Sequence, residues 1–257
     1  MNRWLRPVAR ALDAVPAPVR GVGAARPAAG AAVPFFFRDD DAGWGDERLV
    51  ALLEVFDARA IWVDLAVIPR ELDTGLAREL LSRERVGLHQ HGLAHVSHER
   101  AGRKCEFGPS RDARRQRADI AEGRARLEHL LGGRVDPIFT PPWNRCTRDT
   151  GRCLTELGFG VLSRESRAEP LGIPGLRELP VCTDWVTLDP VAAGERIAAA
   201  IRCGGPVGVM LHHAVMDDAS MRRAGELIEL VAAHEAARAE PMLCARSLPG
   251  AAVAAGP

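Results

Sequence analysis

Three consecutive aspartates, Asp39, Asp40 and Asp41, follow three phenylalanines in the stretch "FFFRDDDAGW", residues 35–44. The apolar run is typical of a strand that buries its phenylalanines. Carboxylates crowded at the end of such a strand repel one another, unless a positive charge lies among them. Their position therefore predicts a bound cation, or a reaction that uses the carboxylates, at the end of this strand.

Four of the eight histidines lie within ten residues, in "HQHGLAHVSH", residues 89–98. His91 and His95 are four apart, so on a helical turn both imidazoles project from one face and can hold a single cation. Gly92 follows His91 where zinc peptidases have a glutamate, so a general base must come from elsewhere, and the aspartate triplet is the natural supplier. Two imidazoles and one carboxylate suit Zn²⁺ and also accept Co²⁺, Ni²⁺ or Mn²⁺.

The elements that must position these groups follow from the pattern of the whole chain. Short apolar runs alternate about seven times with segments of helical period. This alternation is typical of parallel strands joined by right-handed crossovers, either in a closed barrel or in an open doubly wound sheet. No Gly-x-Gly-x-x-Gly follows the first strand, which excludes the dinucleotide-binding type. The expected strands are 33–38, 60–69, 86–92, 137–142, 160–163, 176–185 and 206–213.

Composition limits the class of protein further. The 257 residues carry 34 basic and 34 acidic side chains, so no excess of positive charge indicates a nucleic acid or an anionic membrane as partner. No apolar run reaches the length of a membrane span. Six cysteines occur without a C-x-x-C pair, so we expect reduced, structural thiols in a cytoplasmic protein.

Ala/Pro/Gly-rich ends predict flexible segments at 1–32 and 251–257 around one folded domain at 33–250. Across that domain the sequence resembles the polysaccharide deacetylase family, also called carbohydrate esterase family 4 or the NodB-homology domain. The resemblance rests on the aspartates, the histidine pair, "TPPW", the Asp-Trp pair and the late Leu-His. It implies a distorted (β/α) barrel of about seven parallel strands that binds a divalent metal.

The resemblance also implies roles for the aspartates and histidines. The family has an Asp-Asp pair after the first strand, a catalytic base and then a metal ligand, which falls on Asp39 as base and Asp40 as ligand. The triplet also permits a register one residue later, with Asp40 as base and Asp41 as ligand. The two histidine ligands of the family map onto His91 and His95.

By the same resemblance, the remaining motifs surround the acyl group. Trp143 of "TPPW" would use its backbone N–H to hold the oxyanion. His212 would be the general acid, tuned by Asp184, and Trp185 and Leu211 would line the pocket for the acyl methyl group.

Two positions depart from the family pattern. Thr140 stands where the family usually has an arginine that orients the base, so we expect Arg145 to take over that task or the base to be held less firmly. His213 follows the general acid where the family often has an aspartate, and the sequence gives no reason for this change.

Specificity is expected from the connecting segments. The 103–111 segment contains Arg103, Glu106 and Arg111, which would face a charged or polar sugar. Together with Asn144 and Arg145 it would contact hydroxyls or a phosphate of the substrate, or else be a solvated loop. Aromatic residues make up only 5% of the chain and tyrosine is absent, so no extended stacking platform for a long polysaccharide is expected.

The sequence therefore predicts a metal-dependent deacetylase. Its substrate would be a small N-acetylated sugar, free, nucleotide-activated or lipid-linked, made for a surface glycan such as O-antigen. Two alternatives stay open: a related amide hydrolase that removes a formyl group or opens a cyclic amide or imide, and a catalytically silent glycan- or metal-binding module.

Overall fold

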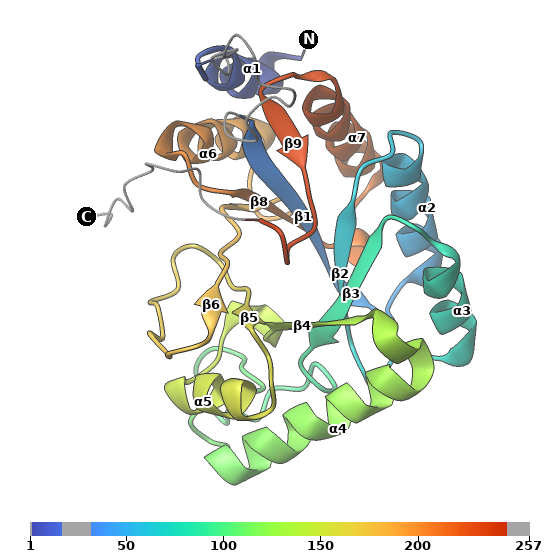
Figure 1. The fold of residues 1–257 in the computed structure, drawn as a ribbon, viewed down its shortest axis with the longest axis vertical. Helices are drawn as coiled ribbons and strands as arrows, with labels where there is room; N and C mark the ends of the chain where they lie inside the picture. The colour runs from blue at the N-terminus through green and yellow to red at the C-terminus, as the bar shows by residue number, and fades with distance from the viewer. Residues whose placement is uncertain (1, 17–31, 246–257) are drawn as a thin grey trace, which may run out of the picture.

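A computed structural model describes residues 2–16 and 32–245. The chain forms one parallel sheet of nine strands that curls into a distorted barrel with helices packed around it (Figure 1). The strands are β1 (Val33–Ala42), β2 (Val63–Val67), β3 (Val86–His91), β4 (Val135–Thr140), β5 (Val161–Leu162), β6 (Arg177–Glu178), β7 (Thr183–Asp184), β8 (Val207–Leu211) and β9 (Ala237–Ala239). The expected (β/α) barrel is thereby confirmed.

Helix α1 precedes the first strand, and each of the other helices follows a strand in sequence, as crossover connections require. They are α1 (Arg6–Asp13), α2 (Asp46–Asp57), α3 (Thr74–Ser82), α4 (Ala113–Leu131), α5 (Arg148–Glu156), α6 (Pro190–Cys203) and α7 (Asp218–Ala233). Short 3₁₀ turns occupy Arg3–Leu5, Gly132–Arg134, Pro142–Asn144 and His213–Val215. The expected order of strands and helices agrees with the structure from β1 to α7, except that the single strand expected at 176–185 is divided into β6 and β7.

The strand order is β6-β5-β4-β3-β2-β1-β8-β7, and β9 pairs with the first residues of β1. One segment closes the barrel by changing its partner. Leu179 N–H donates to the Leu162 carbonyl beside β5, whereas Cys182 N–H donates to the Gly208 carbonyl of β8. Because the strands are parallel, their carboxyl ends meet at one rim, where catalytic groups of such barrels gather.

Strand β1 lies between β2 and β8 in the sheet, and its alternating side chains separate two environments. Phe35 and Phe37 belong to the large core between the sheet and the outer helices. Phe36 lies in the barrel interior with Met210 and Met242. Since successive side chains of a strand point to opposite faces, residues two apart along the regular part of β1 share one environment.

The N-terminal segment differs from the expectation of a flexible stretch over residues 1–32. Residues 3–13 form a 3₁₀ turn and α1, and Trp4, Val8 and Leu12 are buried in the large core. The Trp4 carbonyl lies so close to Gly194 of α6 that a Cβ there would approach it to 2.1 Å. The sequence signal was the amphipathic spacing of Trp4, Leu5, Val8 and Leu12. Residues 17–31 and the predicted tail at 251–257 lie outside the described residues.

Within the described ranges, no helix has both the length and the apolar character of a membrane span. All six cysteines lie in those ranges and are free thiols, as expected.

Candidate active site

The rim at the carboxyl ends of β1 and β3 brings together one carboxylate and two imidazoles. Nε2 of His91 lies 3.1 Å from Oδ1 of Asp41, and Nε2 of His95 lies 3.2 Å from the same oxygen. One ligand atom from each residue lies within 4.8 Å of the other two. The histidine pair and the aspartate triplet, fifty residues apart in sequence, therefore converge as the sequence predicted.

Backbone contacts set the orientation of His91. Its Nδ1 lies 3.0 Å from the carbonyl oxygen of Thr140 on the neighbouring strand β4, which makes Nδ1 the protonated nitrogen. The lone pair of Nε2 then faces Asp41 and His95. A histidine that ligates a metal ion usually donates its other ring N–H in this way.

The turn from His91 to His95 is not helical, contrary to the expected single helical face. His95 has a positive φ of 55°, and Gly92 has a φ of 58°. A Cβ at Gly92 would lie 2.1 Å from an oxygen of Glu106, so glycine is required by space as well as by conformation. Glu106 is buried and accepts hydrogen bonds from the N–H groups of Leu93 and Ala94, at 3.3 and 2.9 Å. It shapes the histidine turn, so its predicted contact with substrate is wrong.

Asp40 lies on the interior face of β1, beside the three clustered ligands. Its two oxygens accept hydrogen bonds from Nε and Nη2 of Arg38, at 2.8 and 2.9 Å. Arg38 is fully buried, and its other donors reach Oγ of Ser163 and Oδ1 of Asn144, both at 2.8 Å. Burial raises the pKa of Asp40, but the Arg38 guanidinium, with His91 and His212, outweighs it, and the net shift is downward.

Arg38 therefore orients Asp40, a task that was expected of Arg145 from the sequence. Arg145 instead donates to the carbonyl of Lys104, at 3.0 Å. Thr140, where the family usually has an arginine, contacts Nε2 of the buried His89 through its hydroxyl, at 2.9 Å. The missed signal was an arginine two residues before an aspartate in an otherwise apolar strand, since such residues share one face.

Asp39 faces the opposite side of β1 and is completely buried. Its oxygens accept hydrogen bonds from the backbone N–H of His213, at 3.0 Å, and from Nδ1 of the same residue, at 2.5 Å. The other ring nitrogen of His213 lies 2.6 Å from the Trp44 carbonyl. Burial lowers the pKa of His213, but Asp39 raises it more, to about 9, so the pair is ionic.

This geometry does not fit the first register, with Asp39 as base and Asp40 as ligand. Asp39 has no access to the rim, and Asp41 rather than Asp40 lies with the two histidines. The register one residue later, with Asp40 as base and Asp41 as ligand, fits both observations. The Asp39–His213 pair also gives a physical reason for the histidine that follows His212.

His212 lies opposite Asp40 at the end of β8. Its Nε2 is 3.8 Å from Oδ2 of Asp40, and its Nδ1 is 4.0 Å from Oδ1 of Asp184. Asp184 also accepts hydrogen bonds from the N–H groups of Val186 and Thr187. His212 is therefore flanked by two carboxylates, in the position predicted for a general acid and its tuning partner.

Two predicted pocket residues point away from the rim. Trp185 is buried against Trp4, with ring centroids 5.4 Å apart, and its Nε1–H donates to the Ser220 carbonyl. Leu211 is in register with Asp39 and belongs to the same outer core. Their predicted role in an acyl pocket is wrong, because alternation along β8 turns Met210 inward instead, where its Sδ lies 2.7 Å from Nη2 of Arg38.

Trp143 and Asn144 border the site from the turn after β4. The Trp143 ring lies 4.4 Å from the His95 ring, measured between centroids. Asn144 is buried and holds Arg38, and Arg145 follows beside a cavity. Arg111 forms an ion pair with Asp119 and does not line that cavity, which leaves its predicted contact with substrate without support.

Backbone strain is concentrated at this rim. Five described residues other than glycine have a positive φ, a conformation that L-amino acids rarely adopt. Four of them are Asp41, His95, Trp143 and Asn144. Strained backbone of this kind persists where the surrounding structure enforces it, and it clusters at functional sites.

The donor set fits a divalent cation. Two imidazole nitrogens and one carboxylate oxygen form the open-sided set that metals such as zinc accept. Burial, followed by the His91 charge, lowers the pKa of His95 to about 4, so His95 is neutral at pH 7, as a ligand must be. Burial lowers the pKa of His91 as well, but Asp41 and Asp40 raise it more, and a cation held there would compete with that proton.

No protein-family model matches the sequence, and a search of curated proteins finds no match. Solved structures do match. A structure assigned as a polysaccharide deacetylase from Mycobacterium smegmatis has a TM-score of 0.61 at 19% identity, over 86% of this chain and 90% of that one. A family 4 carbohydrate esterase from Streptomyces lividans, in complex with acetate, has a TM-score of 0.56 at 13% identity, over 85% and 97%.

A third structure is BA3943, a pseudoenzyme of carbohydrate esterase family 4 from Bacillus anthracis. It has a TM-score of 0.56 at 12% identity, over 81% of this chain and 63% of that one. The chain therefore has the barrel fold of the polysaccharide deacetylases and family 4 carbohydrate esterases. That fold occurs with and without activity, so the function of this chain depends on the residues of its site rather than on the fold.

Proposed function

We propose that this protein is a metal-dependent hydrolase that removes an N-acetyl group from an amino sugar. The observation that carries the proposal is the placement of Asp40 and His212, 3.8 Å apart, beside the three clustered ligands. A carboxylate and an imidazole so placed can act on one substrate: the first removes a proton from the attacking water, and the second donates a proton to the leaving group. The fold shared with deacetylases supports the same conclusion.

Asp41, His91 and His95 would hold the ion. When bound, a divalent ion polarises an acyl oxygen and eases the deprotonation of water. Asp41 accordingly takes the ligand role first assigned to Asp40.

Asp40 would take a proton from the water molecule that attacks the acyl carbon. Arg38 keeps Asp40 ionised and fixes both of its oxygens, so the base does not have to reorient during the reaction. His212 would then give a proton to the departing nitrogen as the carbon–nitrogen bond breaks. The products are acetate and the free amine.

The developing negative charge on the acyl oxygen needs a second partner. The backbone N–H of Trp143 would supply it, because the His95 ring packs against the Trp143 ring and places this residue at the rim. Removal of one such donor typically raises the barrier by about 2.7–4 kcal/mol. A side-chain substitution at Trp143 leaves its backbone N–H in place, and proline, which lacks that N–H, cannot adopt the φ of 56° found at Trp143.

Acetate release from N-acetylated amino sugars tests the proposal. We expect release by the purified protein, loss with a chelator, and recovery with Zn²⁺, Co²⁺, Ni²⁺ or Mn²⁺. Elemental analysis of the same samples should give about one ion per chain. Full metal content with no hydrolysis of any amide would contradict the proposal.

The same assay separates the alternatives. Formate release from N-formylated sugars would indicate a deformylase. The family 4 pseudoenzyme with this fold keeps open a silent binding module, for which metal binding without turnover is the expected result. Asp40 and His212 lie together beside the three clustered ligands, which favours an enzyme.

A further inference from the structure

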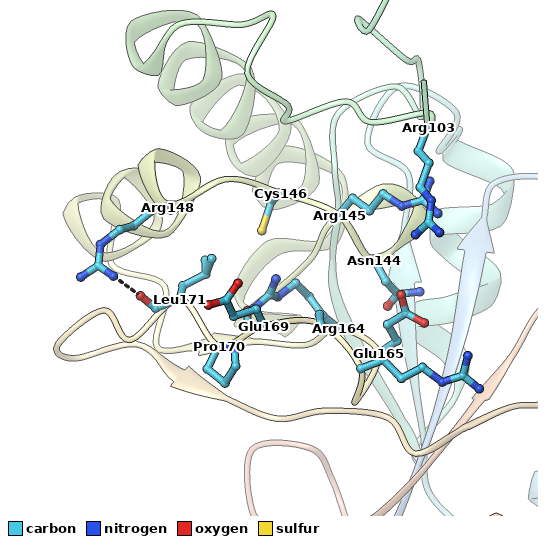
Figure 2. Close-up of a pocket in the computed structure, with 12 residues that line it drawn as sticks. Arg103, Asn144, Arg145, Cys146, Arg148, Arg164, Glu165, Glu169, Pro170 and Leu171 are labelled. Atoms are coloured by element: carbon cyan, nitrogen blue, oxygen red, sulfur yellow. Dashed lines mark hydrogen bonds between the residues drawn. The ribbon is translucent and has the colours of Figure 1, made fainter. Parts of the chain in front are cut away.

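A cavity of about 530 Å³ opens beside the candidate active site (Figure 2). Its walls come from three segments that are distant in sequence: the loop at Arg103, the turn from Asn144 into α5, and the loop that follows β5. The charged side chains that line it are Arg103, Arg145, Arg148, Arg164, Arg167, Glu165 and Glu169. Its volume lies within the range of roughly 300–1,000 Å³ that small-molecule sites occupy.

Five arginines against two glutamates give the lining of this cavity a net positive charge. Among the described residues, no carboxylate lies within ion-pair distance of four of its arginines: Arg103, Arg145, Arg148 and Arg167. Arg164 alone has such a partner, Glu178, at 2.5 Å. Arg148 donates to the Leu171 carbonyl at 2.7 Å and Arg145 to the Lys104 carbonyl at 3.0 Å. These bonds hold the side chains in place but leave their charges unneutralised.

Arg164 provides a second indication of a ligand. It is only 6% exposed, and its Nε has no hydrogen-bond partner among the described residues. A buried guanidinium with an unsatisfied donor is costly in the free protein. The negative charge of an anion bound in the cavity would attract the guanidinium and offset part of that cost.

The cavity adjoins the reacting groups through one short turn. Asn144 lines it and also accepts a hydrogen bond from Arg38, the residue that holds Asp40. The preceding residue, Trp143, packs on His95. A molecule bound in the cavity would therefore lie one turn away from Asp40 and the metal ligands.

We propose that this cavity binds the phosphate-bearing part of the substrate, so that the enzyme acts on an N-acetylated sugar carrying a phosphate or diphosphate. This inference rests on the proposed function. Guanidinium groups bind phosphate oxygens through paired hydrogen bonds, and several of them around one cavity match a multiply charged group. A neutral polysaccharide would leave these charges without partners.

Titration calorimetry of the full chain with inorganic pyrophosphate tests the cavity directly. We expect Arg145→Gln to weaken pyrophosphate binding about tenfold and Arg145→Gln/Arg148→Gln about a hundredfold, with a loss of salt dependence. Arg152→Gln is the matched control, because Arg152 lies on α5 but pairs with Asp149 outside the cavity. All three side chains are partly exposed, and thermal unfolding would verify that each variant folds. Equal affinity in the double variant and the wild type would overturn the inference.

Turnover distinguishes this inference from the proposed function. Three substrates are compared: UDP-N-acetylglucosamine, N-acetylglucosamine on a polyprenyl diphosphate in micelles, and neutral diacetylchitobiose. We expect kcat/KM to favour one of the two diphosphates, and the double variant to lose that preference mainly through KM; which diphosphate is favoured identifies the source. Hydrolysis of all three alike, unchanged in the double variant, would refute the cavity's role and leave the hydrolase intact. Arginine-dependent binding of pyrophosphate without any hydrolysis would refute the hydrolase and leave the anion site.

Discussion

The barrel interior contains buried carboxylates in two regions, and their pKa values are shifted in opposite directions. At the rim, Asp40 is held by Arg38 and its pKa lies below the usual value. Deeper in the interior, Asp64 of β2 is equally buried, and burial raises its pKa to about 8. Its Oδ2 accepts a hydrogen bond from the backbone N–H of Met242, at 3.1 Å. No cation pairs with Asp64 among the described residues.

Asp64 is the neighbour of Arg38 in the sheet register, yet Arg38 pairs with Asp40. The comparison shows that burial alone makes a carboxyl neutral, and that a buried acid is ionised only where the fold supplies a cation. Each aspartate of the triplet has one: His213 for Asp39, Arg38 for Asp40, and His91 for Asp41.

The largest expected effect separates Asp41 from Asp40 at the rim. Asp41→Asn should lose tight metal binding together with turnover, because it removes the only carboxylate ligand of the cluster. Asp40→Asn should keep its metal and lose roughly 10²–10⁴-fold in kcat, the usual contribution of a general base. Metal content by elemental analysis and kcat by acetate release are the measurements; metal loss in Asp40→Asn with retention in Asp41→Asn would restore the first register.

Removal of Arg38, the cation paired with Asp40, should leave Asp40 buried without a cation, as Asp64 is. Arg38→Met leaves a buried carboxylate without its partner, which typically costs about 3–5 kcal/mol of unfolding free energy. The double variant Arg38→Met/Asp40→Asn should recover part of that loss in urea unfolding. Arg145→Met is the control and should leave stability unchanged. No recovery in the double variant would mean that Arg38 acts through packing rather than charge.

The converse change removes the titration of Asp64. Because its folded pKa of about 8 lies above the unfolded value, the folded state holds an extra proton between about pH 4 and pH 8. The stability due to Asp64 is therefore full below pH 4 and falls by about 1.4 kcal/mol per pH unit up to pH 8.

Asp64→Asn should abolish this component. Urea unfolding of both proteins at pH 5 and 6.5 measures it, because other groups contribute equally to both and cancel in the difference. Parallel pH profiles for wild type and Asp64→Asn would show that Asp64 is ionised when folded.

The smallest expected effect concerns Thr140. Thr140→Val should lower the free energy of unfolding by about 1–3 kcal/mol, because it leaves Nε2 of the buried His89 without a partner. It should leave kcat nearly unchanged, since Arg38 on β1 holds the base. A large fall in kcat at full metal content would mean that Thr140 contributes to catalysis directly.

Much of the fold was readable from local patterns. Alternating apolar and helical segments predicted parallel strands joined by crossovers, and the family resemblance implied the barrel. Parallel strands end on the same side, so one shared rim follows from that fold. The histidine pair was correctly linked to the aspartate triplet. Helix α1 was missed because its Ala/Pro-rich surroundings hid four apolar residues of helical spacing, Trp4, Leu5, Val8 and Leu12.

The chain's sequence by itself determined which groups are present and at which rim they gather, since strand period and connection handedness are local properties. Only the tertiary structure decided the register of the three aspartates. Asp39 faces the outer side of β1 and Asp40 the interior, whereas the positive φ of Asp41 brings it to the rim beside Asp40. Whether each becomes a structural ion pair, a base or a ligand depends on the groups that packing brings beside it. Arg38, His213 and the histidine pair come from different strands, so the assignment is settled by the way the sheet closes.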